Sequence, residues 1–219
     1  MNIKIYQINT DRDKNRVKFE GLSENKEIDS SIYDRVFMGD VDCKNLEDVY
    51  TMFNTTGHRL HRGHSLSVSD IVEVDGKFHF CDTFGFESVD FNPAEAHAPL
   101  NLMRVLVLEP KRPPYVSEIE NTLEGQQKAV GGYVQYVYND GDGTITVCDE
   151  EGKLKGLEGC RRIEGDILVG DCFIAGDGGE ELCSLTDEQI EKYTQRYAEP
   201  EDISHDEVVG SMGYTIVGI

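Results

Sequence analysis

Three histidines and two arginines share one short segment of the chain, residues 58–64. His58, His61 and His64 stand three residues apart, and imidazoles at such spacing can meet a metal ion. The segment holds no carboxylate that would complete a common ligand set, so we expect no metal and no cofactor. Arg62 and His64 are instead candidate contacts for a phosphate group or an acidic partner.

A glycine-rich segment, residues 140–146 (DGDGTIT), reproduces the middle of an EF-hand calcium loop. The first ligand position falls on Tyr138, which has no carboxylate, and the twelfth falls on Asp149 instead of glutamate. The flanking residues 133–138 and 144–148 are β-like, whereas an EF-hand has a helix on each side. We therefore expect a hairpin turn here and no calcium site.

Candidate nucleophiles are present, but no catalytic motif accompanies them. The segment around Ser65 lacks the second glycine of a Gly-x-Ser-x-Gly elbow, and no GxGxxG or P-loop pattern occurs. An enzyme would have to be centred on His64, Ser65 and Asp82, which is one alternative for this chain. We expect a protein that is not an enzyme.

The charge balance is strongly acidic, with 42 acidic and 21 basic residues and a net charge of −21. Residues 1–100 hold 18 acidic and 11 basic residues, and residues 101–219 hold 24 and 10. Such a surface repels phosphate backbones and anionic lipid, which disfavours direct nucleic-acid and membrane binding. It attracts basic proteins, although the same charge also serves solubility.

The second half of the chain carries a set of carboxylates that we predict to form one acidic face. These residues are Asp140, Asp142, Glu150, Glu151, Glu158, Glu164 and Asp166. Carboxylates spaced like phosphates can occupy a groove that normally holds DNA. Electrostatic steering and counterion exchange favour the binding of such carboxylates as they favour the binding of DNA. The predicted partner is therefore a basic nucleic-acid-binding or defence protein.

The six cysteines are spread along the chain without a CxxC pair or a zinc-type spacing. We expect reduced thiols that act as small core residues in a bacterial cytoplasmic protein. The N-terminus leads directly into charged sequence, which is unlike a secretory leader, and no apolar run is long enough for a membrane span.

The pattern of elements predicts an α+β fold with two small domains, each a mainly antiparallel sheet with one or two short helices. Two prolines and small residues at 92–100 mark a join, and we place a linker at 96–102, between a domain at 1–95 and another at 103–200. Residues 201–219 are assigned to a C-terminal tail, whose apolar end at 214–219 could add an edge strand or dock a partner.

Local signals assign the elements of the first domain. We expect strands at 3–8, 33–41, 67–74 and 77–82, with a hairpin turn at Asp75-Gly76. Asn45 caps a helix over 46–53.

In the second domain, we expect strands at 104–109, 115–119, 133–138 and 144–148, and a strand pair at 167–175 around Gly170. A helix over 122–130 ends at Gly131, and a capping box at 186–189 starts another that ends near residue 197. Residues 154–162 are read as irregular.

Four blocks in the first half resemble the YodL-like domain, in the order of that family. They are residues 33–39 (YDRVFMG), 46–54 (LEDVYTMFN), 62–72 (RGHSLSVSDIV) and 82–86 (DTFGF). The second half resembles the domain-of-unknown-function family 3846 at residues 105–110 (VLVLEP), 129–134 (AVGGYV), 148–154 (CDEEGKL) and 169–173 (VGDCF). It departs at Asp149 and Cys160, where that family is expected to carry asparagine.

Both families resemble accessory proteins of bacterial plasmids, conjugative elements and phages. The resemblance implies a mobile-element protein that protects incoming DNA or modulates host systems, and it carries over no catalytic residues. The leading hypothesis is a non-enzymatic inhibitor of a host defence or DNA-binding protein that binds as a DNA mimic does. The alternative to this hypothesis is a two-module protein–protein adaptor of a conjugative element. The sequence leaves the partner and the oligomeric state open.

Overall fold

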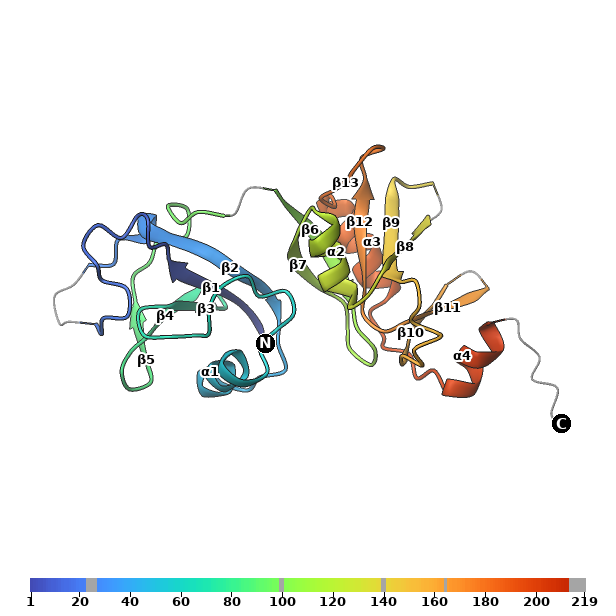
Figure 1. Ribbon diagram of the computed structural model, residues 1–219, viewed down its shortest axis with the longest axis horizontal. Helices are drawn as coiled ribbons and strands as arrows, with labels where there is room; N and C mark the ends of the chain where they lie inside the picture. Colours follow the sequence, from blue (N-terminus) through green and yellow to red (C-terminus); the bar gives the residue numbers. More distant parts are fainter. Residues whose placement is uncertain (23–26, 99–100, 139–140, 164, 213–219) are drawn as a thin grey trace. The chain divides into compact units, whose positions relative to one another are not determined.

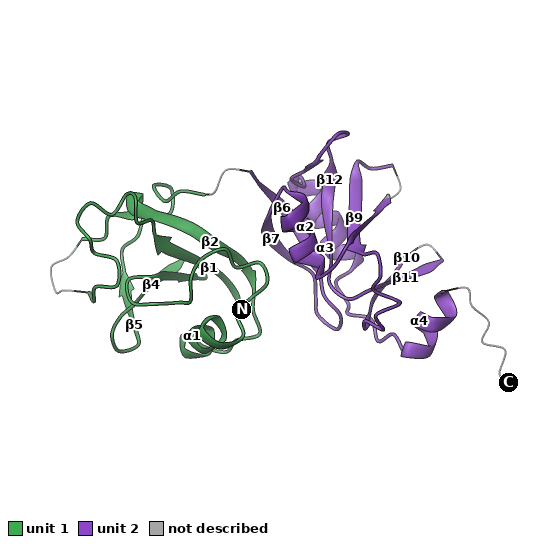
Figure 2. Ribbon diagram, in the orientation of Figure 1, with its two compact units in different colours: residues 1–100 green, residues 101–219 purple. Residues whose placement is uncertain are grey.

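The computed structural model describes residues 1–22, 27–98, 101–138, 141–163 and 165–212. The chain divides into two compact units, residues 1–100 and 101–219 (Figure 2). The described part has an α+β fold with two main antiparallel sheets, of five and six strands, a small two-stranded sheet and four α-helices. This confirms the predicted fold class.

Unit 1 is built on one antiparallel sheet with the strand order β2-β1-β3-β4-β5 (Figure 1). The strands are β1 (Asn2–Ile8), β2 (Tyr33–Asp40), β3 (Ile71–Val74), β4 (Lys77–Cys81) and β5 (Phe86–Val89). A short 3-10 helix, η1 (Ser30–Ile32), precedes β2, and α1 (Leu46–Thr55) follows it.

Local chemistry explains the boundaries of these elements. The Asn45 side chain accepts a hydrogen bond from Asp48 N at 2.8 Å, which starts α1 as predicted. Asp75 and Gly76 both have positive φ, 50° and 74°, as the predicted β3–β4 hairpin requires. The predicted strand over 67–74 is too long, because β3 begins at Ile71. Ser69 has φ 79°, so residues 67–70 form a turn before it.

Unit 2 is built on a six-stranded antiparallel sheet with the order β7-β6-β12-β9-β8, and β13 pairs with β12. The strands are β6 (Leu102–Leu108), β7 (Tyr115–Glu120), β8 (Val134–Tyr138), β9 (Thr144–Asp149), β12 (Cys172–Asp177) and β13 (Leu182–Cys183). A separate two-stranded sheet joins β10 (Gly159–Ile163) to β11 (Asp166–Val169).

The central strands of this sheet are buried on both faces. Leu106 and Ile174 pack with Tyr193 of α3 (Asp187–Arg196), while the alternate residue Val105 points to the other face. Helix α2 (Leu123–Val130) covers that other face (Figure 1). The Thr122 side chain caps the start of α2, and α3 starts at the predicted Thr186 capping box.

Two assignments in unit 2 are corrected by the structure. Residues 154–162 are not irregular throughout, because β10 begins at Gly159 and contains the fully buried Arg161. The Arg161 guanidinium donates to Cys160 O at 2.7 Å and to Glu109 O at 3.2 Å, so a buried strand can hold this charge. The predicted pair around Gly170 is also wrong, because β11 pairs with β10 whereas β12 pairs with β6 and β9.

The C-terminal segment was assigned to a tail, and that assignment stays a prediction. It contains α4 (His205–Ser211), which starts at a Ser204 capping box. The apolar end at 214–219 lies outside the described residues, and with it the possible edge strand.

The linker assignment at 96–102 stays a prediction. His97 N donates to Tyr33 O at 2.9 Å and His97 O accepts from Arg35 N at 2.8 Å, so residue 97 lies along β2 within unit 1.

Candidate functional site

The predicted acidic face is partly neutralised within unit 2, and Asp142 shows how. Its Oδ2 lies 2.6 Å from Lys192 Nζ and accepts a hydrogen bond from the Tyr193 hydroxyl at 2.8 Å. The Thr144 hydroxyl donates to Oδ1 at 2.6 Å. Burial raises the pKa of Asp142, but these hydrogen bonds outweigh it and hold the pKa at about 2. Asp142 therefore fastens α3 to the start of β9.

Three further carboxylates of the predicted face lie beside a lysine of the same unit: Glu158 beside Lys111, Asp166 beside Lys153, and Glu151 beside Lys155. Such exposed pairs contribute little stability, but each cancels charge locally. Glu150 is exposed and forms no ion pair in the described part of the chain. Asp140 and Glu164 lie outside the described residues.

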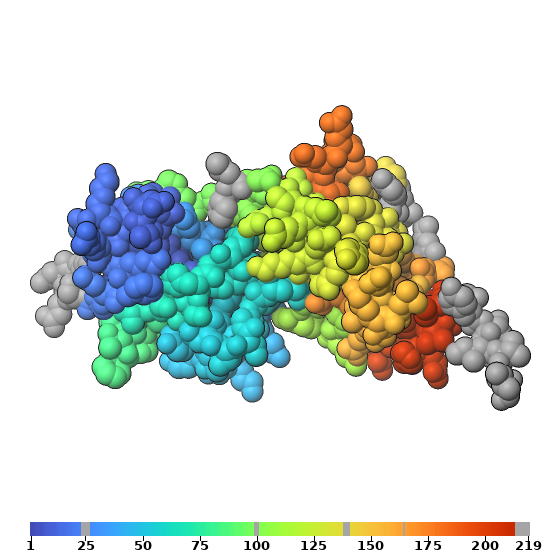
Figure 3. All heavy atoms as spheres, viewed as in Figure 1, coloured from blue at the N-terminus to red at the C-terminus, as the bar shows by residue number. Residues whose placement is uncertain are grey.

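Carboxylates without a cationic neighbour line a groove in unit 2, which we call the unit 2 groove. It has a volume of about 460 Å³ and lies between α2, β8 and the turn that joins β12 to β13. Asp177, Glu180 and Glu181 contribute its charges, and its described lining holds no lysine, arginine or histidine. In Figure 3, the orange segment near residue 178, which is this turn, projects from unit 2.

Exposed apolar and aromatic surface borders the same groove. Leu123 at the start of α2 is 58% exposed, and Tyr136 on β8 is 43% exposed. The Tyr136 hydroxyl donates to Gln126 Oε1 at 2.7 Å, which fixes the ring against α2. The groove thus combines negative charge with an oriented aromatic ring, a combination that suits contact with a basic protein surface.

In unit 1, residues 58–64, which we call the basic segment, are attached to the sheet mainly through Gln7 of β1. Gln7 Oε1 accepts from His64 N at 3.0 Å, and Gln7 Nε2 donates to His64 O at 2.9 Å. Gly63 is required at this approach, because a Cβ atom there would lie 1.9 Å from Gln7 Oε1. Arg62 N donates to Val36 O at 3.0 Å, which holds the segment along β2.

Gln7 also contacts a buried carboxyl group, that of Asp70, which was not singled out from the sequence. Asp70 is 1% exposed, and its Oδ2 accepts from Gln7 Nε2 and from Ser67 N, each at 2.8 Å. Its Oδ1 is buried and has no hydrogen-bond partner in the described residues. Burial raises the pKa of Asp70 to about 7, and burial also lowers the pKa of His64, whose Nδ1 is 3.9 Å away.

The structure does not bring the functional atoms of His64, Ser65 and Asp82 together in one catalytic arrangement. The His64 ring interacts with the carbonyl oxygen of Ser65 at 2.7 Å, and its nearby carboxyl group is Asp70. Asp82 Oδ1 accepts backbone N–H groups of Leu22 and Thr83. With these contacts, the side chains of His64 and Asp82 stabilise the loops that contain them.

The other two histidines of the basic segment pack against aromatic rings. The ring centroid of His58 is 4.7 Å from that of Phe37, and the centroid of His61 is 5.0 Å from that of Phe53. Within the residues that the structure describes, no group of three or more His, Cys, Asp or Glu side chains is placed to hold a metal ion.

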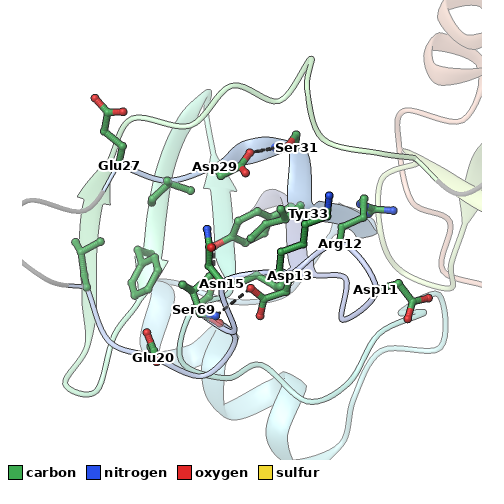
Figure 4. Close-up of a pocket in the computed structure, with 17 residues that line it drawn as sticks. Asp11, Arg12, Asp13, Asn15, Glu20, Glu27, Asp29, Ser31, Tyr33 and Ser69 are labelled. Atoms are coloured by element: carbon green, nitrogen blue, oxygen red, sulfur yellow. Dashed lines mark hydrogen bonds between the residues drawn. The ribbon is translucent and has the colours of Figure 1, made fainter.

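Unit 1 also contains a cavity of about 550 Å³ beside the sheet (Figure 4). Its inner wall includes Tyr33, whose hydroxyl donates to Ser69 O at 2.9 Å. Figure 4 shows Asp13 and Asn15 around the opening, with Glu27 directed away. The volume suits a small molecule, but the charged residues around it have both signs and indicate no single ligand class.

Comparison with family models finds a similarity for each unit. Residues 2–91 match the YodL-like domain, and residues 103–198 match a domain of unknown function, DUF3846. Unit 1 is thus similar to the YodL-like domain and unit 2 to DUF3846, as the sequence blocks predicted. Neither the curated proteins nor the solved structures contained a match. Within the described residues, no helix is both long and apolar enough to span a bilayer.

Proposed function

We propose that this chain is an acidic, non-enzymatic binding protein whose unit 2 groove docks on the basic surface of a DNA-binding protein. One observation carries the proposal: Asp177, Glu180 and Glu181 share a groove whose described lining contains no cation. Asp142, Glu151, Glu158 and Asp166 each have a lysine instead. The groove is therefore a better candidate than the face predicted from the sequence.

Electrostatics and apolar contact have separate roles in this proposal. The negative charge of the chain speeds encounter with a basic partner and selects against acidic ones, with a strong dependence on salt. Exposed charges alone give little affinity. Leu123 and Tyr136 supply apolar surface that a partner can desolvate, as the central residues of protein interfaces do.

The biological setting is part of the proposal. We place the chain among accessory proteins of a bacterial mobile element or phage, acting in the cytoplasm to inhibit a host defence or DNA-binding protein. In that setting, the groove would compete with DNA for the basic surface of its target.

The test compares two triple variants in pull-downs from bacterial lysate. The first, Asp177→Asn with Glu180→Gln and Glu181→Gln, neutralises the groove. The control, which neutralises three exposed carboxylates in and beside α3, is Glu188→Gln with Glu191→Gln and Glu199→Gln. We expect the wild type and the control to capture a basic DNA-binding protein that moderate salt releases, and the groove variant to lose it. Equal capture by both variants would contradict the assignment of the groove.

A further inference from the structure

The fourth sequence block of unit 1, residues 82–86, contains the turn between β4 and β5 and the first residue of β5. Asp82 N donates to Gly85 O at 3.0 Å, and Gly85 has φ 75°, so the glycine serves the turn. Phe84 has no such role, because its side chain is 91% exposed. A phenylalanine at a hairpin tip with almost no internal contact is available to a partner.

Strand β5 has one open edge next to this tip. It lies at the end of the sheet order and pairs with β4 alone within the described residues (Figure 1). Its sequence from Phe86 to Val89 contains no proline and no lysine, and its register with β4 is unbroken. Proline, lysine and a bulge commonly protect an edge strand from pairing with another chain, and β5 has none of them. At the opposite end of the sheet, residue 97 bonds to β2 and covers part of that edge.

A groove of about 1140 Å³ runs beside β5, and we call it the β5 groove. Ile28, Phe78 and Val89 give it an apolar lining. Its carboxylates are Glu27, Asp82, Glu87, Asp90 and Glu95, against one lysine, Lys77. None of the five carboxylates forms an ion pair within the described part of the chain.

Strand geometry links the groove to the open edge. Glu87 and Val89 are two residues apart, so they share a face of the sheet, and they stand opposite Phe80 and Phe78 of β4. A segment that paired with the outer edge of β5 would therefore place alternate side chains on this same face. Those side chains would meet both the apolar lining and the carboxylates.

We infer that β5 and its groove bind an extended segment of another protein, which adds to the sheet as a further strand. Charge complementarity defines the chemistry of that segment: lysine or arginine at alternate positions, facing Glu87 and its neighbours. An apolar residue of the segment would cover Phe84. The site lies in unit 1 and is independent of the proposed role of the unit 2 groove.

The experiment uses the full chain as bait for an immobilised library of random linear peptides. Each of two disruptive variants has a matched control. Glu87→Lys is compared with Asp42→Lys, which makes the same charge change at an exposed site outside the groove. Phe84→Ser is compared with Tyr50→Ser, where the ring is 43% exposed on α1.

We expect enriched peptides with alternating basic residues, and Kd values raised about tenfold or more by Glu87→Lys and Phe84→Ser, equivalent to about 1.4 kcal/mol. Asp42→Lys and Tyr50→Ser should leave Kd unchanged. Amide exchange at residues 86–89 should slow when the peptide is bound. The inference is overturned if no basic peptide is enriched, if the matched variants behave alike, or if exchange at β5 stays the same.

Discussion

The buried carboxyl group of Asp70 predicts an unusual dependence of stability on pH. An aspartate in the unfolded chain has an ordinary pKa of 3.8, whereas burial raises the pKa of Asp70 in the folded protein to about 7. Between these values the folded state holds a proton that the unfolded state has released. The free energy of unfolding must therefore fall as the pH rises through this window.

The size of the effect follows from the two pKa values. Each pH unit inside the window removes about 1.4 kcal/mol, and the loss levels off above the folded pKa. From about pH 5 to about pH 8, Asp70 should lower the free energy of unfolding by about 2.5 kcal/mol. Asp70→Asn removes this titration and keeps an oxygen that can accept from Gln7 and Ser67.

The assay is urea unfolding of wild type and Asp70→Asn at several pH values, with hydrogen exchange of β1 identifying the transition of unit 1. Other charged groups, including His64, are present in both proteins, so the difference between them isolates Asp70. The variant should gain stability over the wild type as the pH rises. A difference that stays constant with pH, or that changes in the opposite direction, would refute this account of Asp70.

Three further predictions concern positions where the structure specifies one side chain, and urea unfolding measures each. Arg161→Met should cost unit 2 about 2–4 kcal/mol, because buried carbonyl oxygens lose their donor; unchanged stability would contradict this. Gly63→Ala should cost about 2 kcal/mol because it displaces Gln7, whereas Gly210→Ala, with open space around it, should be neutral or stabilising; similar effects of both would be the contrary result. Thr186→Ala should cost about 1 kcal/mol by removing the α3 cap, and no loss would count against the capping box.

Local signals were enough to predict most elements, because their chemistry lies within a few residues. The caps at Asn45 and Thr186 and the turn at Asp75-Gly76 each depend on neighbouring backbone groups. Strand β10 was missed for the opposite reason. Arg161 is a charged residue in sequence, and its burial depends in part on carbonyl oxygens far along the chain, those of Glu109 and Arg112.

Ion pairs between residues far apart along the chain also limited the prediction of the binding face from the sequence. Asp142 is 50 residues from Lys192, so its ion pair has no local signal. One sequence feature does indicate the grooves: no lysine or arginine occurs in residues 163–191 or 78–103. Carboxylates in such stretches have no basic neighbours along the chain. Asp177 and Glu180 lie in the first stretch, and Glu87 and Asp90 lie in the second.

The central claim is that this chain occupies a surface that otherwise binds DNA. The most direct measurement is the Kd between the chain and its captured partner from about 50 mM to about 200 mM salt, with and without duplex DNA. The account predicts that Kd rises steeply with salt and that duplex DNA displaces the chain. A Kd that is independent of salt, together with binding that duplex DNA leaves intact, would contradict it.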